Sequence, residues 1–257
     1  MLVYLHGLNS SSRSQKAQRL RAELAPFQVL AVDYRPHRPA EAVARLERFF
    51  TDLGPVAPAV IGSSMGGFYA RYLARRFGFS HLFLINPALT PWTFVDAHLG
   101  ERMTTAGGEE YVVDAALGEE LRRYAVTEPY DQVPTTLFLD RGDEVIDYRI
   151  AERIFADCGR LFVWDGGDHA FQHLDDAIQV LREHLRSRPS ATADGSAGRD
   201  RDRARLQPGR GMEETLGQME TAGVGADGRA DGTQQEDDED PRNPVAPPAA
   251  PGGDVAA

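Results

Sequence analysis

The chain is poor in cysteine and has no long hydrophobic run. Cys158 is the only cysteine among 257 residues, which excludes an intrachain disulfide and argues against a disulfide-stapled secreted scaffold. No apolar stretch reaches the roughly 18 residues of a transmembrane helix, and no charged segment followed by an apolar one precedes the first predicted strand. We therefore expect a soluble cytoplasmic protein with no membrane partner.

Positive charge is scarce, and lysine almost absent. Lys16 is the only lysine, and 39 acidic against 28 basic residues give a formal net charge of −11 at pH 7. A protein that binds nucleic acid needs a basic face, so this composition argues against a nucleic-acid partner.

The C-terminal part lacks aromatic side chains, since Phe171 is the last of them in the chain. Residues 190–257 are rich in Gly, Ala, Pro and charged residues, with 7 Arg and 14 Asp or Glu. Such a segment cannot bury enough apolar area to offset its chain entropy. We predict a folded domain over residues 1–189 and a disordered acidic tail over 190–257, which serves for interaction or for solubility.

Apolar runs alternate with helical patterns through the folded part. This alternation predicts the α/β class, with a mostly parallel sheet flanked by helices. Residues 88–130 form an insertion longer than an ordinary crossover. The remaining elements are expected as strands at 2–5, 28–32, 57–62, 81–85, 135–139 and 160–164, and helices at 14–25, 39–53, 65–77, 147–157 and 172–187.

The most informative motif is Gly-x-Ser-x-Gly, which occupies residues 62–66. An apolar strand pattern precedes it and a helical pattern follows, which is the context of a nucleophile elbow. In such a turn the residues two before and two after the serine must be nearly free of side chain, as Gly62 and Gly66 are. Ser64 is therefore the candidate nucleophile.

A serine nucleophile needs a base and an orienting carboxylate, and both candidates follow predicted strands. His169 comes after the strand at 160–164, and Asp143 after the strand at 135–139. Asp140 and Glu144 stay open as alternatives for the acid. Asp147 fits better as the N-cap of the next helix.

A metal site is the other interpretation of His169, because His173 lies four residues later and would share a helical face with it. No third ligand and no zinc-protease pattern accompanies this pair. We expect no metal and no cofactor.

The turn after the first predicted strand supplies a candidate oxyanion hole. His6 and Gly7 open this turn, and the backbone N–H groups of Leu8 and Met65 would hold a developing oxyanion. An ordinary glycine turn is the alternative.

Substrate contacts are expected from His6 and, in the insertion, from Trp92, Phe94 and Met103, although most apolar residues of the insertion would only pack onto the domain. Lys16 and Arg13 do not fit a phosphate loop. They either bind an anionic substrate group near the site or are solvated.

The assembled motifs resemble the small single-domain bacterial esterases of the YqiA/YcfP type. The resemblance covers about residues 1–187 and rests on five segments, at 5–11, 62–70, 86–88, 142–148 and 166–171. It implies an α/β-hydrolase fold with a lid insertion, hydrolysis of carboxylic esters or acyl-CoA thioesters, and catalytic roles for Ser64, Asp143 and His169. His6 departs from the family pattern, in which some members have glutamine, and the acidic tail is foreign to it.

The sequence thus favours a serine esterase that acts on small-molecule ester or thioester substrates. A peptidase or lactonase could use the same triad. A non-catalytic binding protein of the same fold is the alternative from another class, although such proteins usually lack a member of the triad. Oligomeric state cannot be inferred from these patterns.

Overall fold

A computed structural model describes residues 1–126 and 132–187 of the chain. The chain divides into two units, Met1–Gly195 and Ser196–Ala257, and all described residues belong to the first. The predicted tail over 190–257 and the last residues of the predicted insertion lie outside the described residues, so the domain boundaries stay a prediction.

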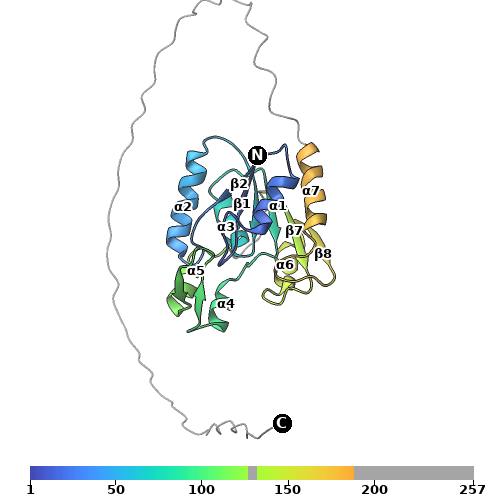
Figure 1. Ribbon diagram of the computed structural model, residues 1–257. Coiled ribbons are helices and arrows are strands. Elements are labelled where there is room, and N and C mark those ends of the chain that lie inside the picture. The colour runs from blue at the N-terminus through green and yellow to red at the C-terminus, as the bar shows by residue number, and fades with distance from the viewer. Residues whose placement is uncertain (127–131, 188–257) are drawn as a thin grey trace, which may run out of the picture. The chain divides into compact units, whose positions relative to one another are not determined.

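The centre of the first unit is a six-stranded sheet with the order β2-β1-β3-β4-β7-β8 (Figure 1). Every neighbouring pair is parallel, so the carboxyl ends of all strands meet at one edge. The strands are β1 (Leu2–Leu5), β2 (Val29–Val32), β3 (Ala59–Ser63), β4 (His81–Ile85), β7 (Thr135–Asp140) and β8 (Gly159–Trp164).

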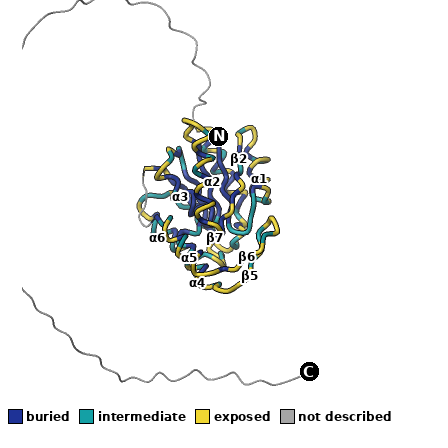
Figure 2. Tube along the Cα trace, turned by 90° about the vertical axis from the view of Figure 1, so that its left-hand side faces the viewer, coloured by how far each residue is buried: buried dark blue, intermediate teal, exposed yellow. Residues whose placement is uncertain are grey.

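Helices cover both faces of this sheet, because alternate strand residues point to opposite sides. In β1, Leu2 and Tyr4 belong to the core cluster under α1 (Gln15–Glu23) and α7 (Leu174–Ser187). Val3 and Leu5 belong to the cluster on the other face, where the helices are α2 (Pro39–Asp52), α3 (Met65–Ala74) and α6 (Tyr148–Phe155). Figure 2 shows the buried strands between partly exposed helices.

The insertion has its own secondary structure at the lower end of the molecule in Figure 1, away from the N-terminus. Its apolar residues Val95, Leu117 and Leu121 join the main core cluster, so most of the segment packs onto the domain as expected. The elements are α4 (Trp92–Ala97), the antiparallel pair β5 (Arg102–Thr104) and β6 (Glu110–Val112), and α5 (Ala115–Arg122).

The predicted elements outside the insertion are all present, with ends that differ by at most a few residues. The predicted cap at Asp147 is also present, because its side chain accepts a hydrogen bond from the backbone N–H of Arg149. Ser14 caps α1 in the same way and accepts from the backbone N–H of Ala17. The mostly parallel sheet flanked by helices is therefore confirmed. Among the described helices, none combines the length and the apolar character needed to cross a membrane.

Candidate active site

Ser64 occupies a strained turn between β3 and α3. Its φ of 54° and ψ of −123° are unusual for a residue with a side chain. A Cβ on Gly66 would lie 2.1 Å from the carbonyl oxygen of Leu5, and one on Gly62 would lie 2.7 Å from that of Gly66. Both contacts are with backbone, which cannot move aside, so the turn needs glycine at these two positions.

The side chains of Ser64, His169 and Asp143 form a continuous chain of hydrogen bonds. His169 Nε2 lies 3.0 Å from Ser64 Oγ, and His169 Nδ1 lies 2.9 Å from Asp143 Oδ2. Asp143 is almost fully buried, and its Oδ1 also accepts the backbone N–H groups of Val145 and Ile146. These bonds hold the carboxylate in a fixed orientation toward the imidazole.

The alternative acids make different contacts. Glu144 accepts the backbone N–H of His169 at 3.0 Å and does not reach the ring. Asp140, which is fully buried, accepts from His173 Nδ1 at 2.6 Å and from the backbone N–H of Gln172 at 2.8 Å. Of the three candidates, Asp143 alone contacts the His169 ring.

A second His–Asp pair therefore lies beside the first and connects the end of β7 to the segment after β8. Asn86, which directly follows β4, also connects these segments. Its Oδ1 accepts the backbone N–H of Asp140 at 2.9 Å, and its Nδ2 donates to the carbonyl oxygen of Asp168 at 3.0 Å. His169 and His173 thus serve different aspartates. In the described part of the chain, no group of three His, Cys, Asp or Glu residues could hold a metal ion.

The turn after β1 lies against Ser64. A Cβ on Gly7 would be 2.9 Å from Ser64 Cβ, so this backbone passes very close to the serine. Leu8 follows in the turn, while Met65 begins α3, where its backbone N–H has no acceptor within the helix. Of the two backbone N–H groups predicted for the oxyanion hole, that of Met65 thus directly follows Ser64 in the chain. That of Leu8 belongs to the turn that lies against Ser64.

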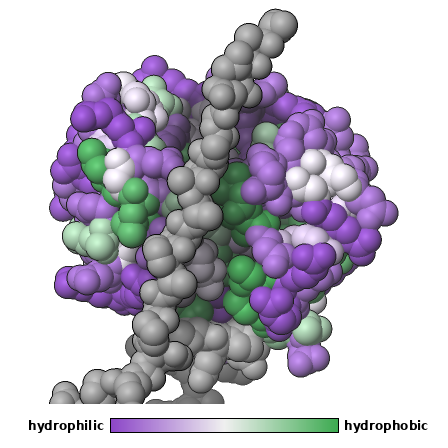
Figure 3. Space-filling view, turned by 90° about the horizontal axis from the view of Figure 1, so that it is seen from below, coloured by the Kyte–Doolittle hydropathy of each residue, from purple (hydrophilic) through white to green (hydrophobic). Residues whose placement is uncertain are grey.

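Two cavities of contrasting character border Ser64. The larger, of about 370 Å³, has mainly polar lining residues, which include Lys16, Gln15 and Gln172. The smaller, of about 180 Å³, has a mainly apolar lining. Its lining residues are Leu8, Asn9, Ser64, Met65, Ala88, Pro91, Phe94, Val145, Ile146 and His169. Figure 3, a view from the end where the insertion lies, shows apolar side chains near the centre of this face among hydrophilic ones.

Only one of the four predicted substrate contacts lines a cavity beside Ser64, and that is Phe94. His6 is instead buried, with its ring against Tyr34 and an exposed fraction of 1%. Burial lowers the pKa of its ring. Trp92 lies near the guanidinium of Arg122, and Met103 Sδ accepts from Asn9. His6, Trp92 and Met103 line neither of the two cavities beside Ser64, and their contact with substrate stays a prediction.

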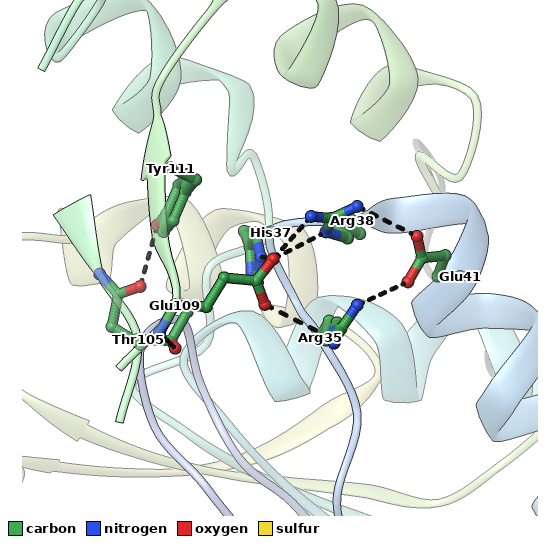
Figure 4. A network of polar contacts seen from close by, with 8 residues as sticks. Arg35, His37, Arg38, Glu41, Thr105, Glu109 and Tyr111 are labelled. Atoms are coloured by element: carbon green, nitrogen blue, oxygen red, sulfur yellow. Dashed lines mark hydrogen bonds and ion pairs between the residues drawn. The ribbon is translucent and has the colours of Figure 1, made fainter. Parts of the chain in front are cut away.

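Polar contacts anchor the β5–β6 hairpin of the insertion to the segment before α2 (Figure 4). Glu109 accepts from Arg38 Nη2 at 2.6 Å and lies 3.4 Å from both Arg35 and His37. The Arg38 guanidinium is the main cause that lowers the pKa of Glu109. Tyr111 stacks on His37 and donates to Asn9 Oδ1 at 2.9 Å, so the hairpin also supports the turn that carries Leu8.

The sequence patterns did not predict two residues that line the apolar cavity, and they left the role of one residue of the polar cavity open. Val145 and Ile146 line the apolar cavity, and two adjacent apolar residues in an otherwise polar loop were an available signal. Lys16, left open between anion binding and solvation, lines the polar cavity, and its Nζ donates to Ser63 Oγ at 2.8 Å. Arg13 is exposed and lines neither cavity.

Several solved structures have the same fold at low sequence identity. A putative hydrolase from Agrobacterium vitis S4 is 21% identical, with a TM-score of 0.57, over 72% of this chain and 86% of that one. Est1E from Butyrivibrio proteoclasticus is 14% identical, with a TM-score of 0.56 and the same coverage. The monoacylglycerol lipase of Paleococcus ferrophilus is 16% identical, with a TM-score of 0.57, over 72% and 93%.

These similarities show the α/β-hydrolase fold. The model of the uncharacterised protein family UPF0227 matches residues 1–185. The chain therefore belongs to the UPF0227 family, the YqiA/YcfP-type group within the α/β-hydrolases.

Proposed function

We propose that this protein is a serine hydrolase that cleaves carboxylic ester or acyl-CoA thioester bonds of small acyl substrates. The observation that carries the proposal is the unbroken hydrogen-bond chain from Ser64 through His169 to Asp143. Its position at the carboxyl edge of the sheet supports it as well, because sites in open α/β sheets gather there.

The first half of the reaction forms an acyl-enzyme. Ser64 Oγ attacks the substrate carbonyl carbon while His169 Nε2 takes the serine proton, and Asp143 stabilises the resulting imidazolium. The backbone N–H groups of Leu8 and Met65 donate to the oxyanion, a contribution of about 3–4 kcal/mol per donor in a well-formed hole. When the tetrahedral intermediate collapses, the carbonyl–leaving-group bond breaks and His169 returns the proton to the leaving alcohol or thiol.

The second half of the reaction uses the same groups in reverse order. His169 takes a proton from water, the resulting hydroxide attacks the acyl carbon, and the bond to Ser64 Oγ breaks with return of the proton to the serine. Every step uses side chains of this protein, backbone N–H groups and water. The small apolar cavity supports a short acyl or alcohol substituent beside Ser64.

The test compares wild type with Ser64→Ala, using p-nitrophenyl butyrate and butyryl-CoA as parallel substrates. We expect Ser64→Ala to lose about 10⁶-fold in kcat, as removal of a triad serine does, and to lose labelling by a fluorophosphonate probe. Ser187→Ala, at the exposed end of α7, is the matched control and retains both. Turnover that persists in Ser64→Ala refutes the nucleophile.

The alternatives give other results in the same assay. A peptidase or lactonase loses the same labelling in Ser64→Ala but turns over a peptide or lactone panel faster than the esters. A non-catalytic protein of this fold fails to react with the probe although it folds. The ratio of ester to thioester turnover then defines the substrate class.

A further inference from the structure

The two cavities beside Ser64 differ in charge as well as in polarity. The lining of the larger one includes two cations, Lys16 and Arg19, and no aspartate or glutamate. The lining of the smaller one has no Lys, Arg, Asp or Glu. Leu8, Ser64 and His169 belong to both. An ester bound at Ser64 would therefore place one substituent in a cationic cavity and the other in an apolar one.

Lys16 is the available cation of the larger cavity. The Arg19 guanidinium is already engaged, because it contacts the carboxylates of Glu23 and Asp175. Lys16 Nζ donates to Ser63 Oγ at 2.8 Å, and within the residues that the structure describes it forms no ion pair. A lysine ammonium has further N–H groups beyond the one used by Ser63, and these stay available to a ligand.

The charge of Lys16 is maintained at neutral pH despite its burial. Desolvation lowers the pKa of Lys16 to about 8, while Asp140, Asp143 and Asp168 act in the opposite direction. At pH 7 the ammonium form therefore predominates. Removing an ammonium from water without a directly paired carboxylate is unfavourable, and an anionic ligand group would supply the missing partner.

We propose that Lys16 makes the larger cavity a subsite for an anionic group, a carboxylate or a phosphate, carried by the ester that Ser64 cleaves. The location follows from the lining of this cavity, which includes both Lys16 and Ser64. The ammonium is hydrogen-bonded to Ser63, the residue before the nucleophile. The inference rests on the proposed function and narrows it. The preferred substrates are esters with one anionic and one apolar substituent, and Lys16 is the residue that selects them.

A purely structural role for Lys16 is the competing explanation, in which it holds Ser63 and offsets the nearby aspartates. That role would affect neutral and anionic substrates equally. The proposed role affects anionic substrates selectively, so the ratio of the two kcat/KM values distinguishes them.

The experiment uses pairs of esters with matched shape. For an anion on the acyl side, mono-p-nitrophenyl succinate is compared with p-nitrophenyl 4-methylpentanoate, whose branched methyl groups replace the carboxylate oxygens. For an anion on the alcohol side, the butyrate ester of glycolate is compared with isobutyl butyrate. Each pair is measured at pH 7 with wild type, Lys16→Met, Lys16→Arg and the control Arg13→Met, which removes an exposed cation outside the cavity.

We expect wild type to prefer at least one anionic ester to its neutral partner. Lys16→Met should lower kcat/KM for that ester about 10-fold or more, as loss of a hydrogen bond between charged groups does, with less than about a 2-fold change for the neutral one. Lys16→Arg should keep the preference, and Arg13→Met should behave as wild type. Absence of a preference in wild type, or an equal fall for both esters in Lys16→Met, overturns the proposal.

A binding measurement separates this inference from the proposed function. Calorimetric titration of monomethyl succinate into Ser64→Ala and into Ser64→Ala combined with Lys16→Met requires no turnover. Weaker binding to the second variant supports the anion subsite, and equal binding overturns it. If wild type cleaves no ester and does not react with a fluorophosphonate, the proposed function fails, and the titration still decides the role of Lys16.

Discussion

Two His–Asp pairs lie next to each other in this molecule, and they are alike in composition and unlike in surroundings. Asp143 lies in the loop after β7 and Asp140 is the last residue of β7, while both histidines follow β8. His169 Nδ1 lies 2.9 Å from Asp143, and His173 Nδ1 lies 2.6 Å from Asp140. Both aspartates are buried, and the histidine side chains are exposed to similar degrees, 25% and 27%.

The difference lies at the far side of each imidazole ring. His169 presents Nε2 to Ser64 Oγ, whereas the His173 ring stacks on Trp164, with the ring centroids 5.4 Å apart. Asp140 also accepts the Gln172 backbone N–H and therefore holds the loop that carries His169. In the proposed mechanism the first pair moves a proton, whereas the second supports a loop, and the difference lies in the neighbours of each pair.

The largest difference between the two pairs is expected on substitution of Asp143. We expect Asp143→Asn to lower kcat about 10⁴-fold, because asparagine neither stabilises an imidazolium nor keeps the productive tautomer, with a melting temperature near that of wild type. Glu144→Gln is the matched control: it retains an acceptor for the His169 backbone N–H and should lose only a few-fold. A small loss in Asp143→Asn would contradict its assignment as the acid.

At Asp140 we expect a large loss of stability and a small loss of activity, which is the reverse of the result expected at Asp143. Asp140→Asn removes the charge of a fully buried carboxylate that two donors contact, and we expect the free energy of unfolding to fall by about 3 kcal/mol. The loss of kcat should be far smaller than in Asp143→Asn, because His169 keeps its own aspartate. Urea unfolding measures the loss of stability, and ester kinetics measure the loss of activity. Unchanged stability together with lost activity would contradict the supporting role of the Asp140–His173 pair and assign it to catalysis.

Two neighbouring glycines test how tightly the Asp140 side chain is packed. Gly166 and Gly167 have nearly equal positive φ values of 71° and 74°, but a Cβ on Gly167 would lie 2.0 Å from Asp140 Oδ2, whereas one on Gly166 meets nothing within 4 Å. Alanine strains the backbone equally at both positions. We expect Gly167→Ala to be less stable than Gly166→Ala by about 2 kcal/mol, the cost of overpacking. Equal stabilities would show that the Asp140 side chain moves freely.

The smallest expected effect concerns Lys16, whose pKa both aspartates raise through their charge. Since Lys16 loses its proton as pH rises through about 8, any preference for an anionic over a neutral ester should decline across that range. In Asp140→Asn the decline should begin at lower pH by a fraction of a unit, because one negative charge is gone. Tyr4, Arg19 and His169 also line this cavity, and Asp168 acts on Lys16 through its charge. A wild-type preference that stays constant to pH 10 would contradict the role of Lys16.

Much of the fold could be predicted because its signals are local. Alternating apolar strands and helical patterns predicted all six sheet strands, and the cap at Asp147 follows from side-chain chemistry at a single position. Of the four residues predicted to contact substrate, His6, Trp92 and Met103 line neither cavity beside Ser64. Their side chains are apolar or aromatic, but the direction in which each points depends on packing against residues that are distant in the sequence.

The strained serine turn can be predicted from the sequence alone, because it depends on a short spacing and on the absence of side chains at Gly62 and Gly66. The candidate acid and base can also be found there, because Asp143 and His169 each follow a predicted strand. The tertiary structure decided which aspartate contacts which histidine, and it brought Lys16 to Ser63 across 47 positions of the chain. The physical reason is that a parallel sheet gathers the carboxyl ends of distant strands at one edge. Contacts at that edge are determined by packing, which spacing along the chain does not encode.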